Sequence, residues 1–466
     1  GGAPFERLVG AKSGAFTAVV TPDFGEATGM GSFRLPWWPQ VLHTGRMLVL
    51  DKLLSRSLRL GALELIASSG ERKRYGEPTA QPVVVRLGDE ATARAIGRNP
   101  ALGAGEAYMD GRLSFDQGTI WDLVDLLGRN LRWDRDNALR VSLWGQARMA
   151  AWWDQRNYRT RSRRNVAHHY DLGDDLYDLF LDRERQYSCA YFEADNRGSG
   201  PLGEGSDLER AQQDKMARIA AKLDLKPGQR VLDIGCGWGG LSRFLHRVAG
   251  VEVVGVTLST EQHATAIRRA VEAGMADALT YRLMDYRDVE GPFDRIVSVG
   301  MFEHVGRPNY RTFFDKVASL LAPDGVALLH TIGRMGGPGA TDPWTAKYIF
   351  PGGYTPALSE MAPAIERAWL WMTDIEVWRL HYAWTLAHWH RRCQAAREQI
   401  VALYDEKFMR MWEFYLAGAH SAFANDDHVV YQIQLARQRD GVPLTRAYIA
   451  ETEQAYRAKA GRAKAG

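Results

Sequence analysis

The sequence predicts an α/β fold: a Rossmann-like, mostly parallel sheet of seven strands, preceded by a smaller α+β domain. Three observations lead to this prediction. Five apolar runs rich in β-branched residues alternate with amphipathic segments between residues 230 and 332. A glycine-rich turn, VLDIGCGWGG over residues 231–240, includes the first of these runs. At 466 residues the chain also exceeds one ordinary domain, so a second one is expected.

The alternating region predicts the larger domain, residues 166–466. Strands are expected over 230–235, 251–257, 279–284, 293–300 and 326–332, with helices over 241–248, 260–273 and 310–321. Right-handed crossovers make such strands parallel and cover both sheet faces. Residues 375–380 and 428–437 predict two more strands, the last antiparallel. Ligands of such sheets bind beyond the carboxyl ends of the strands, and those ends carry Asp233, Thr257, Asp285, Gly300 and His330.

The rest of the chain divides by composition. Residues 1–50 are rich in Gly and Pro and predict a poorly ordered arm. Residues 51–130 predict the α+β domain, with a helix over 53–69, a strand over 82–88, a turn and a short extended piece over 106–116, and a helix over 118–131. Residues 193–207 predict a Gly-rich surface loop, and residues 455–466 a solvated basic tail.

Residues 131–165 predict a basic linker helix. Six arginines lie between residues 148 and 164, interleaved with Trp152, Trp153 and Tyr158. Such a run is ordinarily a solvated helix; the alternative is contact with anionic phospholipid headgroups. The tryptophans, 15 in all, leave the same two interpretations open, a packed core or a lipid-facing surface.

Composition excludes several classes of protein. The formal net charge of +3 is too small to indicate a nucleic-acid partner. The three cysteines, Cys189, Cys236 and Cys393, have neither metal-ligand nor disulfide spacing, which fits a reducing cytoplasm and no metal. No run approaches the roughly 18 apolar residues of a membrane span, so we expect any membrane contact to be peripheral.

The glycine-rich turn predicts an adenosine cofactor. A nicotinamide dinucleotide site needs an acid at the end of the next strand, but that strand ends at Thr257. The acid here precedes the glycines, in the order Asp233, Gly235, Gly237, Gly239, which is typical of S-adenosylmethionine (SAM) enzymes. A merely structural turn is the remaining alternative. After the third strand, Asp285, Tyr286 and Arg287 are placed to bracket an adenine, although an acid there is also an ordinary helix N-cap.

Five segments together resemble the cyclopropane-fatty-acyl-phospholipid synthase family, relatives of the mycolic acid cyclopropane synthases. They are HHYDLGDDLYDLFLDRERQYSCAYF (168–192), VLDIGCGWGGLS (231–242), VVGVTLSTEQ (253–262), VSVGMFEHVG (297–306) and LLHTIG (328–333). The resemblance runs from about residue 166 to the C-terminus, and GEAYMDGRL (105–113) is similar to the N-terminal domain of the same synthases. It implies a class I SAM-dependent methyltransferase fold.

The resemblance also implies an activity: transfer of a methylene group from SAM to the double bond of an unsaturated phospholipid acyl chain, closing a cyclopropane ring. The implied base is a bound bicarbonate. By matching positions, five groups would hold the bicarbonate: the backbones of Cys189 and Ile332, the side chains of Glu303 and His330, and the phenol of Tyr382. Tyr187 and Ser188 would contact the carboxylate end of SAM, and Gly235, Gly237 and Gly239 would form a backbone cradle for it. Its ribose would contact Thr257, Leu258 and Gln262, and its adenine would contact Tyr286 and Arg287. Taken singly, Cys189 and His330 are ordinary core residues.

The family further implies a homodimer in the cytoplasm, peripheral on the inner face of the cytoplasmic membrane. One segment departs from the pattern: VWRLHYAWTLAHWHRR (377–392) is bulkier around Tyr382, which leaves acyl preference and product open. An alternative is therefore an acyl C-methyltransferase that gives methyl-branched, methylene or furan-precursor lipids. A second is a non-catalytic partner that binds SAM and lipid.

Overall fold

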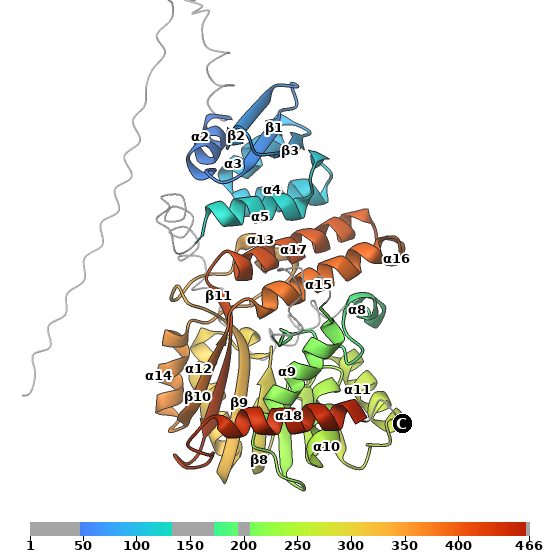
Figure 1. Ribbon diagram of the computed structural model, residues 1–466, viewed down its shortest axis with the longest axis vertical. Coiled ribbons are helices and arrows are strands. Elements are labelled where there is room, and N and C mark those ends of the chain that lie inside the picture. Colours follow the sequence, from blue (N-terminus) through green and yellow to red (C-terminus); the bar gives the residue numbers. More distant parts are fainter. Residues whose placement is uncertain (1–46, 133–171, 194–205, 463–466) are drawn as a thin grey trace, which may run out of the picture. The chain divides into compact units, whose positions relative to one another are not determined.

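The computed structural model describes residues 47–132, 172–193 and 206–462 (Figure 1). All of them belong to one compact unit, residues 45–466. Residues 1–46 of the predicted arm, nearly all of the predicted linker helix and residues 194–205 of the predicted loop lie outside the described residues. Helix α2, Met47–Ser57, begins inside the region predicted as an arm.

The main sheet has the predicted seven strands, in the order β10-β11-β9-β8-β5-β6-β7. The strands are β5 Arg230–Ile234, β6 Glu252–Thr257, β7 Leu279–Leu283, β8 Phe293–Val299, β9 Leu321–Arg334, β10 Trp371–Trp378 and β11 His428–Ala436. Strands β5 to β9 pair in parallel, and β11 runs antiparallel to both of its neighbours. The mostly parallel sheet, the two added strands and the direction of the last are therefore confirmed.

Helices cover both faces because side chains alternate along these strands. In β9, Leu329 packs with the core under α12 (Tyr310–Leu320) and α14 (Leu358–Arg367), whereas Leu328 packs with the core on the opposite face. That second core contains residues of α9, Leu208–Lys222, α10, Gly240–Ala249, α11, Thr260–Glu272, and α18, Ala447–Arg462. The helices predicted over 241–248, 260–273 and 310–321 are confirmed.

The predicted basic tail is wrong as far as residue 462. Residues 447–462 form helix α18, which packs on α9 and α10 (Figure 1). Ile449, Tyr456 and Ala460 are buried because their spacing of seven and four places them on one helix face. Ion pairs add to this packing: the guanidinium of Arg218 in α9 lies 2.7 Å from Glu453.

A third core is strongly aromatic and contains residues of α8 (Asp174–Phe180), α13 (Pro343–Tyr348), α15 (His381–Ala395), α16 (Arg397–Leu403) and α17 (Glu406–Ala424). Four of its tryptophans are fully buried: Trp344, Trp378, Trp389 and Trp412. For these tryptophans the packed-core interpretation is confirmed. No helix in the described part of the chain has both the length and the hydropathy that crossing a bilayer requires.

Residues 47–132 form the smaller α+β region, which has its own core. Its four-stranded sheet has the order β2-β1-β3-β4. Its strands are β1 Ala62–Ile66, β2 Arg72–Gly76, β3 Pro82–Leu87 and β4 Leu113–Gln117, and its other helices are α3 Glu90–Arg98, α4 Pro100–Met109 and α5 Ile120–Asn130. The helix predicted over 53–69 is wrong beyond residue 57. Gly61, at φ +69°, breaks it, and the apolar run that follows pairs as β1 with β2 and β3.

Strand β10 faces α9 with a buried ionic cluster. The ammonium of Lys222 is fully buried and lies 2.5 Å from the carboxylate of Glu376, which also accepts two hydrogen bonds from Arg218 at 2.6 and 2.9 Å. Burial raises the pKa of Glu376, but the hydrogen bonds and charges of Arg218 and Lys222 outweigh it and lower that pKa to about 2 from an ordinary 4.5. The ionised carboxylate is therefore required by the fold.

We predict that Glu376→Gln lowers the free energy of unfolding by about 3 kcal/mol, because Lys222 loses the carboxylate to which it donates and keeps the more distant Asp374, at 3.6 Å. Folding lowers the pKa of Glu376, so its ionised carboxylate stabilises the folded protein fully above pH 4.5, its ordinary pKa. This contribution to the free energy of unfolding is lost as the pH falls from 4.5 through the folded pKa, about 2. Urea titrations across this pH range measure both effects. The exposed Glu366→Gln is the control, and equal stability of the two variants would contradict the prediction.

The turn between β5 and α10 needs glycine for two reasons. Gly235 and Gly239 have φ of +82° and +72°, in the left-handed region. A Cβ would lie 2.8 Å from the Cβ of Met301 at Gly235, and 2.5 Å from the phenol oxygen of Tyr281 at Gly239. The backbone here thus packs directly against neighbouring strands and loops, as a cofactor-binding turn must.

We predict that Gly239→Ala destabilises the fold more than Gly274→Ala. Gly274 also has a positive φ, +67°, but a Cβ there meets nothing within 4 Å. The control therefore carries only the backbone strain of about 1–2 kcal/mol, and Gly239→Ala adds overlap with the Tyr281 ring. Chemical denaturation of both variants measures the difference; similar losses would show that the turn has room for a side chain.

Candidate active site

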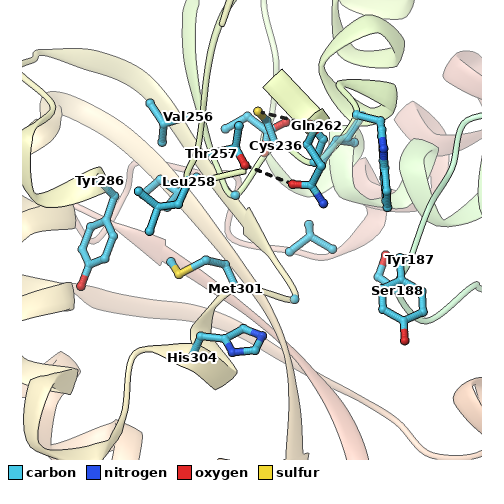
Figure 2. A pocket seen from close by; sticks show the side chains of 18 of the residues that line it. Tyr187, Ser188, Cys236, Val256, Thr257, Leu258, Gln262, Tyr286, Met301 and His304 are labelled. Carbon is cyan, nitrogen blue, oxygen red and sulfur yellow. Dashed lines mark hydrogen bonds between the residues drawn. The ribbon is translucent and has the colours of Figure 1, made fainter. Parts of the chain in front are cut away.

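A cavity opens at the carboxyl ends of β5, β6 and β8 (Figure 2). Every residue predicted to bind the cofactor lines it except Gly239: Tyr187, Ser188, Asp233, Gly235, Gly237, Thr257, Leu258, Gln262, Asp285, Tyr286 and Arg287. Gly300 also lines it, as its strand-end position predicts. Tyr286 lies at one end of the cavity, and Tyr187 and Ser188 lie at the other (Figure 2).

At the Tyr286 end, Asp285 is an N-cap, the ordinary role that the sequence analysis left open for it, and its role as an adenine ligand stays a prediction. Asp285 caps a short 3₁₀ helix by accepting the backbone N–H of Arg287 at 3.0 Å. Its two carboxylate oxygens also accept the Arg287 guanidinium at 2.8 and 2.6 Å. The Tyr286 ring packs edge-on against Phe313, and burial raises its pKa to about 12, so the phenol stays protonated. This end offers a flat ring beside a rigid acid, as an adenine requires.

In the middle of the cavity, Thr257 and Gln262 orient one another. The Thr257 hydroxyl donates to Oε1 of Gln262 over 3.1 Å, and the amide nitrogen of Gln262 is then directed into the cavity (Figure 2). An amide N–H there suits the hydroxyl oxygens of a ribose. Both residues come from the β6–α11 connection, where Ser259 caps α11 by accepting the backbone N–H of Gln262.

Asp233 plays a structural part as well as lining the cavity. Its Oδ2 accepts the Ser242 hydroxyl at 2.7 Å, which ties the end of β5 to α10 across the glycine turn. Burial raises the pKa of Asp233 to about 6, against the hydrogen bond from Ser242 and the charge of Lys215.

The sequence analysis missed several residues that line the same cavity: Arg185, Trp238, Met301 and His304. All four were within reach, because Arg185 lies in the segment 168–192, Trp238 in the glycine-rich turn, and Met301 and His304 in the segment that carries Glu303. Burial lowers the pKa of His304 to about 4, so this imidazole is neutral. The Arg185 guanidinium lies over the Trp238 ring at 5.9 Å.

None of the five residues predicted to hold a base lines this cavity, but two of them are next to lining residues in the chain. Cys189 follows Ser188, and Glu303 lies between Met301 and His304. Oε1 of Glu303 accepts the Ile332 backbone N–H at 2.6 Å, so that N–H serves the carboxylate. Oε2 is buried and has no partner at hydrogen-bond geometry among the residues that the structure describes, although the Thr331 side chain lies close enough to help lower the pKa of this carboxyl. Burial raises the pKa of Glu303 to about 7, against the hydrogen bond from Ile332, so this carboxyl holds a proton at neutral pH far more readily than an exposed one.

The prediction that His330 lies at the end of its strand is wrong, because the residue lies within β9. Pairing with β8 stops at Val299 and His330, whereas pairing with β11 continues to Arg334. The imidazole is buried, and the Gln432 side-chain amide lies 3.1 Å from its Nδ1. Burial lowers the pKa of His330 well below its usual range, so the ring is neutral.

Cys189 and Tyr382 are buried in the aromatic core with Ile332 packed against them. The Cys189 thiol donates to the Ala190 carbonyl, and burial raises its pKa, so it is not a thiolate nucleophile. The Tyr382 ring packs against Trp389 and Phe423. The structure therefore surrounds Tyr382 with aromatic rings, next to the segment that carries Tyr187 and Ser188.

Comparison with known proteins places this geometry in a family. Residues 157–433 match the model of the mycolic acid cyclopropane synthetase family. The chain is 39% identical over 361 residues to the cyclopropane-fatty-acyl-phospholipid synthase of Escherichia coli (strain K12), covering 76% of this chain and 88% of that protein. It is 33% identical over 420 residues to the tuberculostearic acid methyltransferase UfaA1 of Mycobacterium tuberculosis, covering 86% of this chain and 95% of that one.

Solved structures agree. The cyclopropane synthase MmaA2 from Mycobacterium tuberculosis superposes with a TM-score of 0.55 and 34% identity, covering 59% of this chain and 98% of that one. The mycolic acid cyclopropane synthase CmaA1, complexed with S-adenosylhomocysteine (SAH) and CTAB, gives 0.54 and 33% over the same shares. With its seven-stranded sheet, cofactor cavity and glycine turn, the chain belongs to the mycolic acid cyclopropane synthetase family of class I SAM-dependent methyltransferases.

Proposed function

We propose that this enzyme transfers a methylene group from SAM to the double bond of an unsaturated acyl chain in a membrane phospholipid, forming a cyclopropane. One observation carries the proposal: a carboxyl group with an unpartnered, buried oxygen, Glu303 Oε2, lies beside the cofactor cavity. An ordinary methyltransferase needs no such group. The Escherichia coli relative, by its name, acts on phospholipid acyl chains and covers most of this sequence.

The chemistry sets the demands on the site. The alkene carbon attacks the SAM methyl group, the sulfonium sulfur leaves with its electron pair as SAH, and a carbocation remains on the acyl chain. Loss of one proton from the added methyl group lets its electron pair close the ring. An alkene is a weak nucleophile, so alignment and stabilisation of the cation must supply most of the rate. Rings such as Tyr187, Trp389 and Tyr382 stabilise a cation through their faces without attacking it.

A bound bicarbonate would accept the proton, and the residues present fit such an anion. Glu303 has a raised pKa, so its Oε2 can carry a hydrogen and donate it, while Oε1 stays occupied by Ile332. With the Gln432 amide donating to its Nδ1, His330 offers an Nε2–H. The backbone of Cys189 and the phenol of Tyr382 would complete the set. The neutral His330 and the Glu303 carboxyl, in its protonated form, orient an oxyanion without repelling it.

The proposed substrate lies in a bilayer, so we propose that the enzyme works at the membrane surface, peripheral on the inner face of the cytoplasmic membrane. The homodimer remains a prediction. A second candidate is an acyl C-methyltransferase that loses the proton elsewhere and yields methyl-branched or methylene lipids. The similarity to a protein named tuberculostearic acid methyltransferase, over 86% of this chain, favours keeping it.

We predict that Glu303→Gln slows turnover by about 10²–10⁴-fold, the usual contribution of an acid–base group, and leaves SAH affinity unchanged. A Gln amide can still donate a hydrogen bond to the anion, but unlike the carboxyl it cannot exchange a proton with it. Vesicles of monounsaturated phospholipid with methyl-labelled SAM report turnover, and calorimetric titration of SAH reports binding. Glu366→Gln, on an exposed helix position, is the matched control. Unimpaired turnover in Glu303→Gln would remove the proposed anion site.

The product separates the two candidate functions. Cyclopropane and methylene isomers have equal mass, so mass spectrometry of the lipid cannot distinguish them. Proton NMR of the modified acyl chain separates ring methylene protons from vinylic and methyl protons. We expect ring protons, and a product with only methyl or vinylic signals would favour the C-methyltransferase.

A further inference from the structure

Helix α9 carries two polar side chains that no part of the proposed reaction uses. Gln212 and Lys215 are both completely buried, at 0% exposure, although their neighbours on the helix are apolar residues of the sheet-facing core. Their spacing of three places them on one face of α9. Burying an amide and an ammonium costs stability unless each finds partners, so their surroundings show what they are for.

Both side chains bind the segment that ends the cofactor cavity. The Lys215 ammonium donates to Oε1 of Gln186 at 2.6 Å and to the hydroxyl oxygen of Ser188 at 2.8 Å. The Gln212 amide donates to the backbone carbonyls of Gln186 and Ser188, at 3.2 and 3.0 Å. Four hydrogen bonds from one helix face thus hold residues 186–188.

The charge around Lys215 is balanced. Burial lowers its pKa to about 8, against the attraction of Asp182, Cys189 and Asp233, so it remains mainly protonated at neutral pH. Asp182 belongs to the same segment and accepts the backbone N–H groups of Gln186 and Glu184, at 2.7 and 3.0 Å. The charge of the Lys215 ammonium is therefore balanced by nearby carboxylates, and the ammonium is free to donate hydrogen bonds to Gln186 and Ser188.

The direction of these hydrogen bonds has a consequence for the cavity. An ammonium can only donate, so the Ser188 oxygen must accept from Lys215, and its own proton turns elsewhere. Ser188 lines the cavity at the end opposite Tyr286 (Figure 2). A carboxylate can only accept. Lys215 thereby makes Ser188 a donor where a carboxylate is expected.

Gln212 acts on the next peptide in the same way. It holds the Ser188 carbonyl toward α9, and in a trans peptide the following N–H points the opposite way. That N–H belongs to Cys189, whose backbone is proposed to contact the anion. One helix face thus orients donors toward both ligands.

We infer that Lys215 is a positioning residue for SAM: by donating to Ser188 it presets the serine hydroxyl to bind the carboxylate of the cofactor's methionine part. The inference rests on the proposed placement of that carboxylate at Ser188. It requires no lipid substrate, so a binding experiment tests it apart from the proposed reaction.

The test compares two ligands that share the adenosine part. SAH carries the carboxylate, whereas 5′-methylthioadenosine lacks the whole amino-acid part. We expect Lys215→Met to weaken SAH binding by about ten-fold or more, the usual size of a hydrogen bond to a charged group, and to leave methylthioadenosine binding unchanged. Calorimetric titration measures both. Lys222→Met, the loss of a buried lysine of α9 that contacts Glu376 instead, is the matched control and should change neither affinity.

Equal losses for both ligands in Lys215→Met would make Lys215 a structural residue, and no loss for either would exclude any role; both results overturn the inference. Ser188→Ala keeps the test valid if Lys215→Met does not fold, because wild-type SAH affinity in Ser188→Ala overturns it as well. A double-mutant cycle completes the test: Lys215→Met should cost no further SAH affinity once Ser188 is Ala.

Discussion

The backbone turn that leaves β5 is the constraint on which the rest of the site depends. Gly235 and Cys236 both donate their N–H groups to the Val256 carbonyl, at 2.9 and 3.1 Å, which locks the turn to the neighbouring strand β6. Asp233 then ties the same turn to α10 through Ser242. A turn held in this way brings the ends of β5, β6 and β8 to one cavity, and the side chains that face a cofactor follow from those strand ends.

Polar groups of the site are used in pairs, one to set the other. Thr257 sets Gln262, Gln432 sets His330, Ile332 sets Glu303, and Lys215 sets Ser188. In each pair the first residue fixes which hydrogen-bonding group the second presents to a ligand. This arrangement matters in a buried, apolar site, because a misdirected donor cannot be corrected by water there. The pairs thus supply orientation, and the aromatic core around Tyr382 is dry packing beside them.

The sheet was predictable from the sequence because parallel strands that are buried on both faces are continuous apolar runs. The cofactor cavity was predictable because ligands of such sheets bind at the carboxyl ends of the strands. The predictions failed where a tertiary contact decided the outcome. The run over 53–69 is apolar enough for a helix, yet Gly61 and pairing with two strands make its second half β1. The Ala- and Lys-rich segment after residue 454 resembles a tail until α9 covers Tyr456. His330 lies inside β9 because an antiparallel partner extends that strand. The role of Lys215 was not predicted because a lysine within an apolar helical segment is ordinarily a surface residue.

The contact between α9 and α18 affects how the domain is made. Arg218 of α9 pairs with Glu453, a residue 235 positions later in the chain. A ribosome adds about 5–20 residues per second, so the apolar side of α9 stays without this cover for on the order of ten seconds or more during synthesis. Throughout that interval the nascent chain exposes the apolar side of α9, and it is a natural client for chaperones that shield such surfaces.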